Sequence, residues 1–168
     1  EKETEIKELT ETVRSNGDSV GGIIEVVVQG LPVGAGEYMF SSLEGSISQL
    51  VFAVPAIKGI EFGLGFGFGS SLGSEVNDAF YVDDGVIKTK TNNNGGINGG
   101  LSNGMPITFR VAVKPTPSIA IEQDTVNLKT MQNDKITVGG RHDSCIAIRA
   151  VPVLEAVTAI AIYDNLND

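Results

Sequence analysis

The segment ITFRVAVK, Ile107–Lys114, has the clearest strand pattern in the chain. Its apolar residues at 107, 109, 111 and 113 alternate with Thr108, Arg110, Ala112 and Lys114. Successive side chains of a strand point to opposite faces, so this alternation predicts a strand with one apolar face. It also predicts that Arg110 and Lys114 lie on the same face, two pleats apart.

Three other segments have helical spacing. Ile6, Leu9 and Val13 predict an amphipathic helix that ends near Arg14, where Asn16-Gly17 stops it. A second helix is predicted over 40–54, with Ser41 or Ser42 as its cap and Pro55 ending it. A third is predicted to begin at about Pro152, with a buried stripe of Val153, Leu154, Val157, Ile160 and Ala161.

The remaining apolar runs predict strands. They lie at 22–29 and 58–63, in a hairpin of 80–82 with 86–88, and more weakly at 118–123, 126–129 and 135–138. Helices and strands alternate irregularly, and several strands have short connections. This order favours an α+β fold with antiparallel sheets over a doubly wound parallel sheet.

Composition narrows the class of protein. A chain of 168 residues predicts one domain, 1–168, and the net charge of −9 argues against general nucleic-acid binding. Residues 1–84 carry a net charge of −10 and residues 85–168 a net charge of +1, so an anionic ligand is expected in the second half. No apolar run is long enough to span a bilayer. The acidic start, Glu1–Glu5, and the single cysteine, Cys145, lead us to expect a cytoplasmic protein.

Two glycine-rich segments are candidates for ligand binding. GLGFGFG, at 63–69, lacks the spacing of a dinucleotide-binding turn, and we expect no helix directly after it but a mobile or strand-edge segment. TNNNGGINGGLSNG, at 91–104, is too polar to be expected as a regular element. We favour a ligand-facing loop over a disordered linker there, because long irregular loops inside compact domains are usually functional.

Two further segments hold the candidate chemical groups. In Lys114–Ser118 (KPTPS), a lysine and two hydroxyls in a proline-stiffened turn are donors suited to phosphate. Gly140–Cys145 (GRHDSC) contains the only histidine, His142, between an arginine and an aspartate. We expect that these three side chains cannot all converge if they occupy adjacent strand positions. One histidine and one cysteine are too few for a typical zinc site, so no metal is expected.

Seven segments, in this order, resemble landmarks of the chorismate synthase family. They are GDSVGG at 17–22, GLPVGAGE at 30–37, AVPAIKGIEFGLGF at 53–66, GSEVND at 73–78, TNNNGGINGGLSNGMPI at 91–107, KPTPSI at 114–119 and GRHDSCIAIRAVPVLEA at 140–156. The resemblance implies a lyase that eliminates phosphate from 5-enolpyruvylshikimate 3-phosphate in an anti-1,4 reaction, giving chorismate for aromatic amino-acid biosynthesis. It implies reduced FMN as cofactor, linked to NADPH, and a homotetramer with helices sandwiched between antiparallel sheets. Whether an attached reductase activity or an outside source reduces the flavin stays open.

The resemblance also assigns residues by matching motif. For FMN binding these are Pro55, Ala56, Gly99, Lys114, Pro115, Thr116, Pro117, Ser118 and Arg141, and for proton transfer with the reduced flavin Asp143. Pro55 replaces an asparagine common in relatives, Pro117 a common serine and Ser144 a frequent proline. The resemblance implies that the strand end, the glycine loop and the arginine-bearing turn converge around one flavin.

The motifs of the family's N-terminal half are absent: a Gly-x-Ser-His-Gly block, a second catalytic histidine and an Arg-Ser-Ser run. We therefore expect this chain to be a fragment, half of the family fold, that is inactive alone. Two alternatives remain open at this point. One is a non-catalytic structural or assembly module, and the other is a flavin oxidoreductase that consumes reduced flavin in proportion to product.

Overall fold

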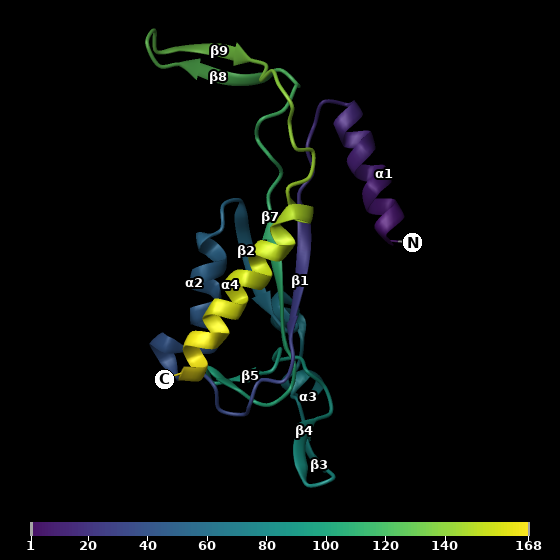
Figure 1. The fold of residues 1–168 in the computed structure, drawn as a ribbon, viewed down its shortest axis with the longest axis vertical. Helices are drawn as coiled ribbons and strands as arrows, with labels where there is room; N and C mark the ends of the chain where they lie inside the picture. The colour runs from purple at the N-terminus through teal and green to yellow at the C-terminus, as the bar shows by residue number, and fades with distance from the viewer. Residues whose placement is uncertain (1, 168) are drawn as a thin grey trace.

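The computed structural model describes residues 2–167, and a three-stranded antiparallel sheet forms its centre (Figure 1). The strand order is β1 (Gly22–Val28), β7 (Ile107–Val113), β2 (Ile57–Phe62). ITFRVAV is thus the central strand, with Arg110 opposite Glu25 on one side and Glu61 on the other. Its four odd-numbered residues are buried and Arg110 is exposed, so the predicted alternation is confirmed.

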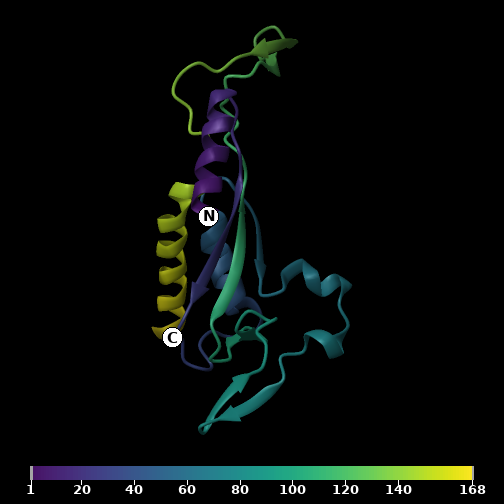
Figure 2. The same cartoon turned by 90° about the vertical axis from the view of Figure 1, so that its right-hand side faces the viewer.

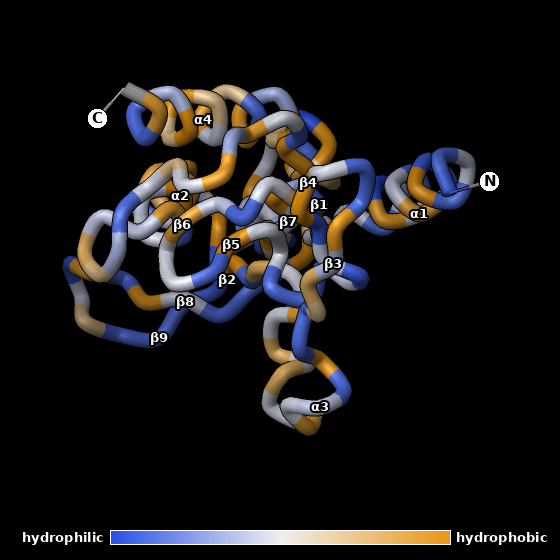
Figure 3. Tube along the Cα trace, turned by 90° about the horizontal axis from the view of Figure 1, so that it is seen from below, coloured by the Kyte–Doolittle hydropathy of each residue, from blue (hydrophilic) through white to orange (hydrophobic). Residues whose placement is uncertain are grey.

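Two helices cover the apolar face of this sheet, α2 (Leu43–Ala53) and α4 (Ala147–Asn167). Figure 2 shows α4 alongside the strands, and Figure 3 shows α2 next to α4. The core lies between the two layers. Its fully buried side chains include Leu43, Ile47, Val51, Ile107, Phe109, Val111 and Leu154.

The start of α2 follows the predicted capping chemistry. A short 3-10 helix, η1 (Met39–Ser41), precedes it, and the Ser42 hydroxyl accepts a hydrogen bond of 3.1 Å from the Gly45 N–H. The predicted helix over 40–54 therefore begins later, at Leu43. It ends at Ala53, two residues before Pro55, because the residue before a proline is driven into extended conformation.

The predicted start of the last helix is wrong. Helix α4 begins at Ala147, so Pro152 lies inside it. Ala147 is buried against Gly22 of β1, where a Cβ atom on the glycine would come within 2.8 Å of the alanine Cβ. This contact starts the helix earlier than the proline indicates. The predicted stripe is also partly wrong, since Val153 and Ile160 are exposed while Leu154 and Ala161 are buried.

The elements outside the sheet project from it. Helix α1 (Lys2–Ser15) has no buried residue and stands apart from the sheet (Figures 1 and 3). Three hairpins complete the strands: β3 (Phe80–Asp83) with β4 (Val86–Thr89), β5 (Ile97–Asn98) with β6 (Leu101–Ser102), and β8 (Gln123–Asn127) with β9 (Gln132–Ile136).

Three sequence predictions need correction here. The weak strands predicted at 118–123, 126–129 and 135–138 are instead the single hairpin β8–β9, with different bounds. The loop at 91–104 is not fully irregular, because β5 and β6 lie within it and Gly95, Gly96 and Ile97 are buried. The segment 63–69 is also more regular than expected. It contains a 3-10 helix, η2 (Gly65–Ser70), and a four-residue helix, α3 (Gly73–Val76), follows.

The α+β prediction with antiparallel sheets is confirmed. All strand pairs among residues 2–167 are antiparallel. One sheet and one layer of helices are two of the three layers of the expected sandwich.

Candidate functional site

A cavity of about 850 Å³ lies where the end of α1, the segment after β7 and the segment before α4 meet. The two segments flank the β8–β9 hairpin in the sequence, and both connect it to the rest of the chain in Figures 1 and 2. The cavity is lined by Arg14, Gly17, Asp18, Thr116, Ser118, Ala120, Gly140, Arg141, His142, Asp143, Ser144 and Arg149. Four predicted site residues, Thr116, Ser118, Arg141 and Asp143, are thereby brought together.

The carboxylate of Asp143 is held at both oxygens. Its Oδ1 accepts a hydrogen bond of 3.2 Å from the Cys145 N–H, and its Oδ2 pairs with Arg149 Nε at 2.9 Å. The side chain is about one-third exposed, so the carboxylate is fixed in position but still reachable from the cavity. A fixed, reachable carboxylate is suited to accept or return a proton.

The charges of the cavity favour an anion. Three arginines face two aspartates in the lining, and Arg149 is already paired with Asp143. Arg14 and Arg141 have no ion-pair partner among residues 2–167. Unpaired guanidinium groups in a concave site are the usual partners of phosphate and carboxylate groups.

Two buried hydroxyls at the cavity are unsatisfied. Thr116 Oγ1 and Ser144 Oγ have no hydrogen-bond partner in the described part of the chain. A buried polar atom without a partner costs roughly 1–3 kcal/mol, so such atoms are expected where a ligand or a rearrangement supplies one. Hydroxyls and arginines together fit the phosphate of FMN. Among the described lining residues, Ala120 alone has an apolar side chain, so this cavity offers little for the isoalloxazine ring.

The segment that contains His142 is not a strand. Arg141, His142 and Asp143 all line the cavity, although neighbouring strand positions would point apart. The expectation was made for adjacent strand positions and does not apply, because residues 139–143 have no regular secondary structure. His142 Nε2 lies 2.8 Å from the Val138 carbonyl oxygen, and that contact ties the segment back on itself.

A second group of predicted residues lies beside the cavity rather than in its lining. The Lys114 N–H donates a hydrogen bond of 2.9 Å to the Ala56 carbonyl oxygen, which joins the end of β7 to the turn before β2. Ala56 has a φ of 73°, an uncommon conformation for a residue with a side chain. Pro55, Pro115 and Pro117 are exposed in the same two segments.

Gly99 is not brought to this group within one chain. It follows β5, at the end of the sheet where β7 begins, whereas Lys114 follows the last residue of β7 (Figure 1). Seven residues of strand separate those ends by about 20 Å. Gly99 is exposed with a φ of 61°, and no atom lies within 4 Å of where its Cβ would be. Within this chain, Gly99 is therefore out of reach of a small ligand in the cavity.

Sequence reasoning missed Asp78, which organises the asparagine-glycine loop. Its Oδ1 accepts hydrogen bonds from Thr91 Oγ1 at 2.7 Å and from the Asn93 N–H at 2.8 Å, and its Oδ2 accepts one from the Asn94 N–H at 2.8 Å. Burial by itself would raise the pKa of Asp78, but the hydrogen bonds from Asn94, Thr91 and Asn93 outweigh it and hold the pKa below its ordinary 3.8. The loop therefore depends on the charged form of one side chain.

We expect the replacement Asp78→Asn to lower the free energy of unfolding by about 2–3 kcal/mol at pH 7, because the amide turns a donor toward a backbone N–H. The folded pKa lies below the unfolded one, so the stabilisation is present above pH 3.8 and is lost as the pH falls through the folded value. Urea denaturation at pH 7 and pH 3 should show the difference from wild type shrinking in acid. The exposed Asp83→Asn serves as control, and an equal loss from it would contradict the role of Asp78.

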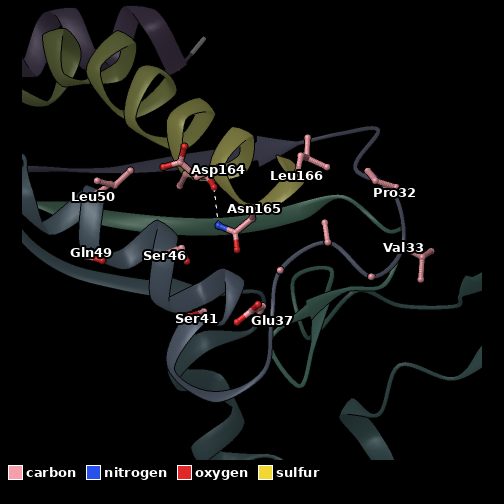
Figure 4. A pocket seen from close by; sticks show the side chains of 14 residues that line it. Pro32, Val33, Glu37, Ser41, Ser46, Gln49, Leu50, Asp164, Asn165 and Leu166 are labelled. Atoms are coloured by element: carbon pink, nitrogen blue, oxygen red, sulfur yellow. Dashed lines mark hydrogen bonds between the residues drawn. The ribbon is translucent and has the colours of Figure 1, made fainter. Parts of the chain in front are cut away.

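Another cavity, of about 860 Å³, lies between the loop 32–37, α2 and the end of α4. Figure 4 shows Glu37 and Asp164 on opposite sides of it, with Asn165 Nδ2 donating a hydrogen bond of 2.8 Å to the Ala161 carbonyl oxygen. Its described lining holds these two acids and no lysine or arginine. An anionic ligand does not fit this cavity.

Two features are absent among residues 2–167. No group of three or more His, Cys, Asp or Glu side chains is arranged to hold a metal ion there. None of the helices in that range combines the length and the apolar character needed to cross a membrane.

Comparison with known proteins gives concordant matches. The sequence model of the family described as chorismate synthase matches residues 1–166. A chorismate synthase of Dehalococcoides mccartyi is 51% identical over 156 residues, which cover 93% of this chain and 43% of that protein. One from Methanothermobacter thermautotrophicus is 51% identical over 154 residues, or 91% of this chain and 41% of that protein.

A solved structure agrees with these sequence matches. A crystal structure of a chorismate synthase superposes with a TM-score of 0.77 and 32% sequence identity, covering 97% of this chain and 42% of that one. The chain therefore spans about two fifths of the length of the relatives that it matches.

Proposed function

This chain belongs to the chorismate synthase family, and on that premise we propose that it contributes the anion-binding part of the active site of a lyase that converts 5-enolpyruvylshikimate 3-phosphate to chorismate with reduced FMN. One observation carries the proposal. Thr116 and Ser118 meet Arg141 and Asp143 in one cavity, although the β8–β9 hairpin separates the two segments in the sequence.

The residues of this chain would hold two kinds of group. The segment Lys114–Ser118 and the Arg141 guanidinium would bind the flavin phosphate and the substrate anions. The Thr116 hydroxyl is available, because it has no hydrogen-bond partner among residues 2–167. Ala56 would contact the cofactor through its backbone, because the 2.9 Å hydrogen bond from the Lys114 N–H to its carbonyl oxygen places it beside that segment. Pro55 and Gly99 are proposed contacts as well, the latter from another copy.

Asp143 would move the proton. The elimination breaks the bond from carbon to phosphate oxygen and a bond from carbon to hydrogen, and one additional carbon–carbon double bond forms. Phosphate and a proton leave, so no net oxidation occurs. Bound reduced FMN would supply electron density to the substrate. Arg149 and the Cys145 N–H keep the Asp143 carboxylate oriented, as a residue exchanging a proton at the flavin requires.

The oligomeric state, the cellular location and the source of reduced flavin are proposed from the family. We propose a homotetramer in the cytoplasm, with flavin reduction linked to NADPH, and residues 1–168 as part of a larger fold that also contains the second sheet. The coverage of relatives supports this division, because the matched proteins are more than twice as long as the aligned region.

The test is an anaerobic assay with reduced FMN and 5-enolpyruvylshikimate 3-phosphate. The 168-residue chain alone is expected to form no chorismate, and activity is expected when the part of the family chain that it does not match is supplied. Catalytic rather than stoichiometric use of reduced flavin separates a lyase from an oxidoreductase. No flavin binding and no product after restoration would favour a structural module and overturn the proposal.

A further inference from the structure

We call the cavity lined by Thr116, Ser118, Arg141 and Asp143 the anion cavity. Arg14 also lines it, but lies outside the segments that the sequence analysis selected for candidate chemical groups. It lies in the last turn of α1 and is exposed, without an ion-pair partner among residues 2–167. Asp18, the acid of the cavity closest to it in sequence, bonds to its own turn, with Oδ1 accepting a hydrogen bond of 2.8 Å from the Ser19 N–H. The charge of Arg14 is therefore not matched by an acid of the lining.

The turn that follows Arg14 is bonded to both walls of the cavity. The Gly17 carbonyl oxygen accepts a hydrogen bond of 2.8 Å from the Ala120 N–H, and Ser19 Oγ donates one of 2.6 Å to the Thr116 carbonyl oxygen. On the other wall, the Val20 N–H donates one of 2.8 Å to the Ser144 carbonyl oxygen. These three bonds fix the end of α1, and Arg14 with it, relative to the walls.

Glycine at position 17 makes this attachment feasible. Gly17 has a φ of +70°, its N–H donates to the Arg14 carbonyl oxygen at 3.0 Å, and the Asp18 N–H donates to the Val13 carbonyl oxygen at 3.0 Å. This pattern closes a helix and turns the chain sharply. A Cβ at this position would come within 3.0 Å of the Ala120 Cβ.

Core packing does not explain where Arg14 lies. Helix α1 has no buried residue; its apolar side chains Ile6 and Leu9 are 49% and 52% exposed, and Val13 is half-buried. The three bonds at its C-terminal turn are thus the described polar attachments that bring the helix to the cavity. The alternative explanation is that an arginine in the last turn merely complements the helix dipole.

We infer that Arg14 is a further anion-binding residue of this cavity, acting with Arg141 on a phosphorylated ligand. Arg14 approaches from α1 and Arg141 from the segment before α4, so the two guanidinium groups reach the ligand from different parts of the chain. The inference deepens the proposed function and rests on it only for the identity of the ligand.

The test is titration calorimetry of the full 168-residue chain with inorganic phosphate at low, chloride-matched ionic strength. Arg14→Ala is expected to weaken phosphate binding about tenfold, because a charge-assisted hydrogen bond is lost. Arg14→Lys should weaken it less, since the charge stays but the forked geometry is lost. Lys7→Ala removes the same charge from an exposed site on the same helix and should leave phosphate affinity unchanged.

A second readout separates ligand contact from a helix-dipole role. Phosphate should slow amide hydrogen exchange in the last turn of α1 of the wild type but not of Arg14→Ala, with unchanged far-UV circular dichroism in both. Wild-type affinity in Arg14→Ala, or no phosphate binding by the wild type, overturns the inference. A different result would contradict the proposed function alone. In that result, phosphate binding depends on Arg14, but FMN binds no better than riboflavin and the restored enzyme forms no chorismate.

Discussion

Replacing Asp143 with asparagine is expected to lower kcat for chorismate formation by roughly 10²–10⁴-fold, the range typical for loss of a positioned proton-transfer group. The amide has nearly the same shape, and its oxygen can still accept from the Cys145 N–H, which donates to Asp143 Oδ1 at 3.2 Å. The amide loses the ion pair with Arg149 and cannot take up a proton. Steady-state kinetics of the restored full-length enzyme with reduced FMN measure this effect. KM should change only a few-fold, because Arg141 and the Lys114–Ser118 segment would still bind the anions.

The control for this variant is Asp124→Asn, which removes a carboxylate from the exposed β8–β9 hairpin, where it pairs with Lys135 at 3.0 Å. Its kcat should stay at the wild-type value, because an exposed pair of this kind contributes little. A kcat for Asp143→Asn within a few-fold of wild type would remove Asp143 from the mechanism. A loss of FMN affinity equal to the loss of rate would assign it a binding role instead.

The elements that sequence predicts best are those in which local pattern and tertiary packing agree. The alternation at 107–113 identifies β7, because all the residues of its buried face lie in one short segment at every second position. The same logic fails for α4, where Pro152 is a strong local signal for a first turn. Burial of Ala147 against Gly22, 125 residues away in the chain, decides the start instead, and no local pattern contains that contact.

The phase of α4 shows the same limit. Ala147, Leu154 and Ala161 are spaced by seven residues and are all buried. Val153 and Ile160 precede two of them by one position, which rotates each by about 100° around the helix and out of the core. Apolar side chains on both faces of a helix leave its orientation undetermined until the partner surface is known.

Motif resemblance likewise identified one part of the candidate site and missed another. Motif resemblance found Thr116, Ser118, Arg141 and Asp143, which the fold brings into one cavity. It did not find Arg14, because the last turn of an exposed helix has no pattern that indicates a ligand. Nor did it predict that Gly99 lies at the other end of β7, since the distance between two loops depends on which strand joins them. The roles assigned to all ten residues stay predictions.

The free energy of unfolding is expected to fall by about 3–5 kcal/mol when Phe109 is replaced by alanine. Phe109 is 1% exposed in the central strand, and its ring centroid lies 5.3 Å from that of Phe62 on β2. Phe109 pairs with both neighbouring strands, and residues of both covering helices belong to the same core, so the structure cannot collapse into the space left behind without moving several elements. Urea denaturation at pH 7 measures the change.

Phe66→Ala is the matched control, because the Phe66 side chain is 88% exposed on η2 and its removal should change the free energy of unfolding by less than about 0.5 kcal/mol. A small effect at Phe109 would mean that the sheet and the two helices do not form one core. The anion cavity would then lose its support as well, since β7 leads into Thr116 and Ser118, and α4 begins just after Asp143. Core stability and phosphate affinity should therefore fall together in Phe109→Ala, whereas Arg14→Ala should lower phosphate affinity alone.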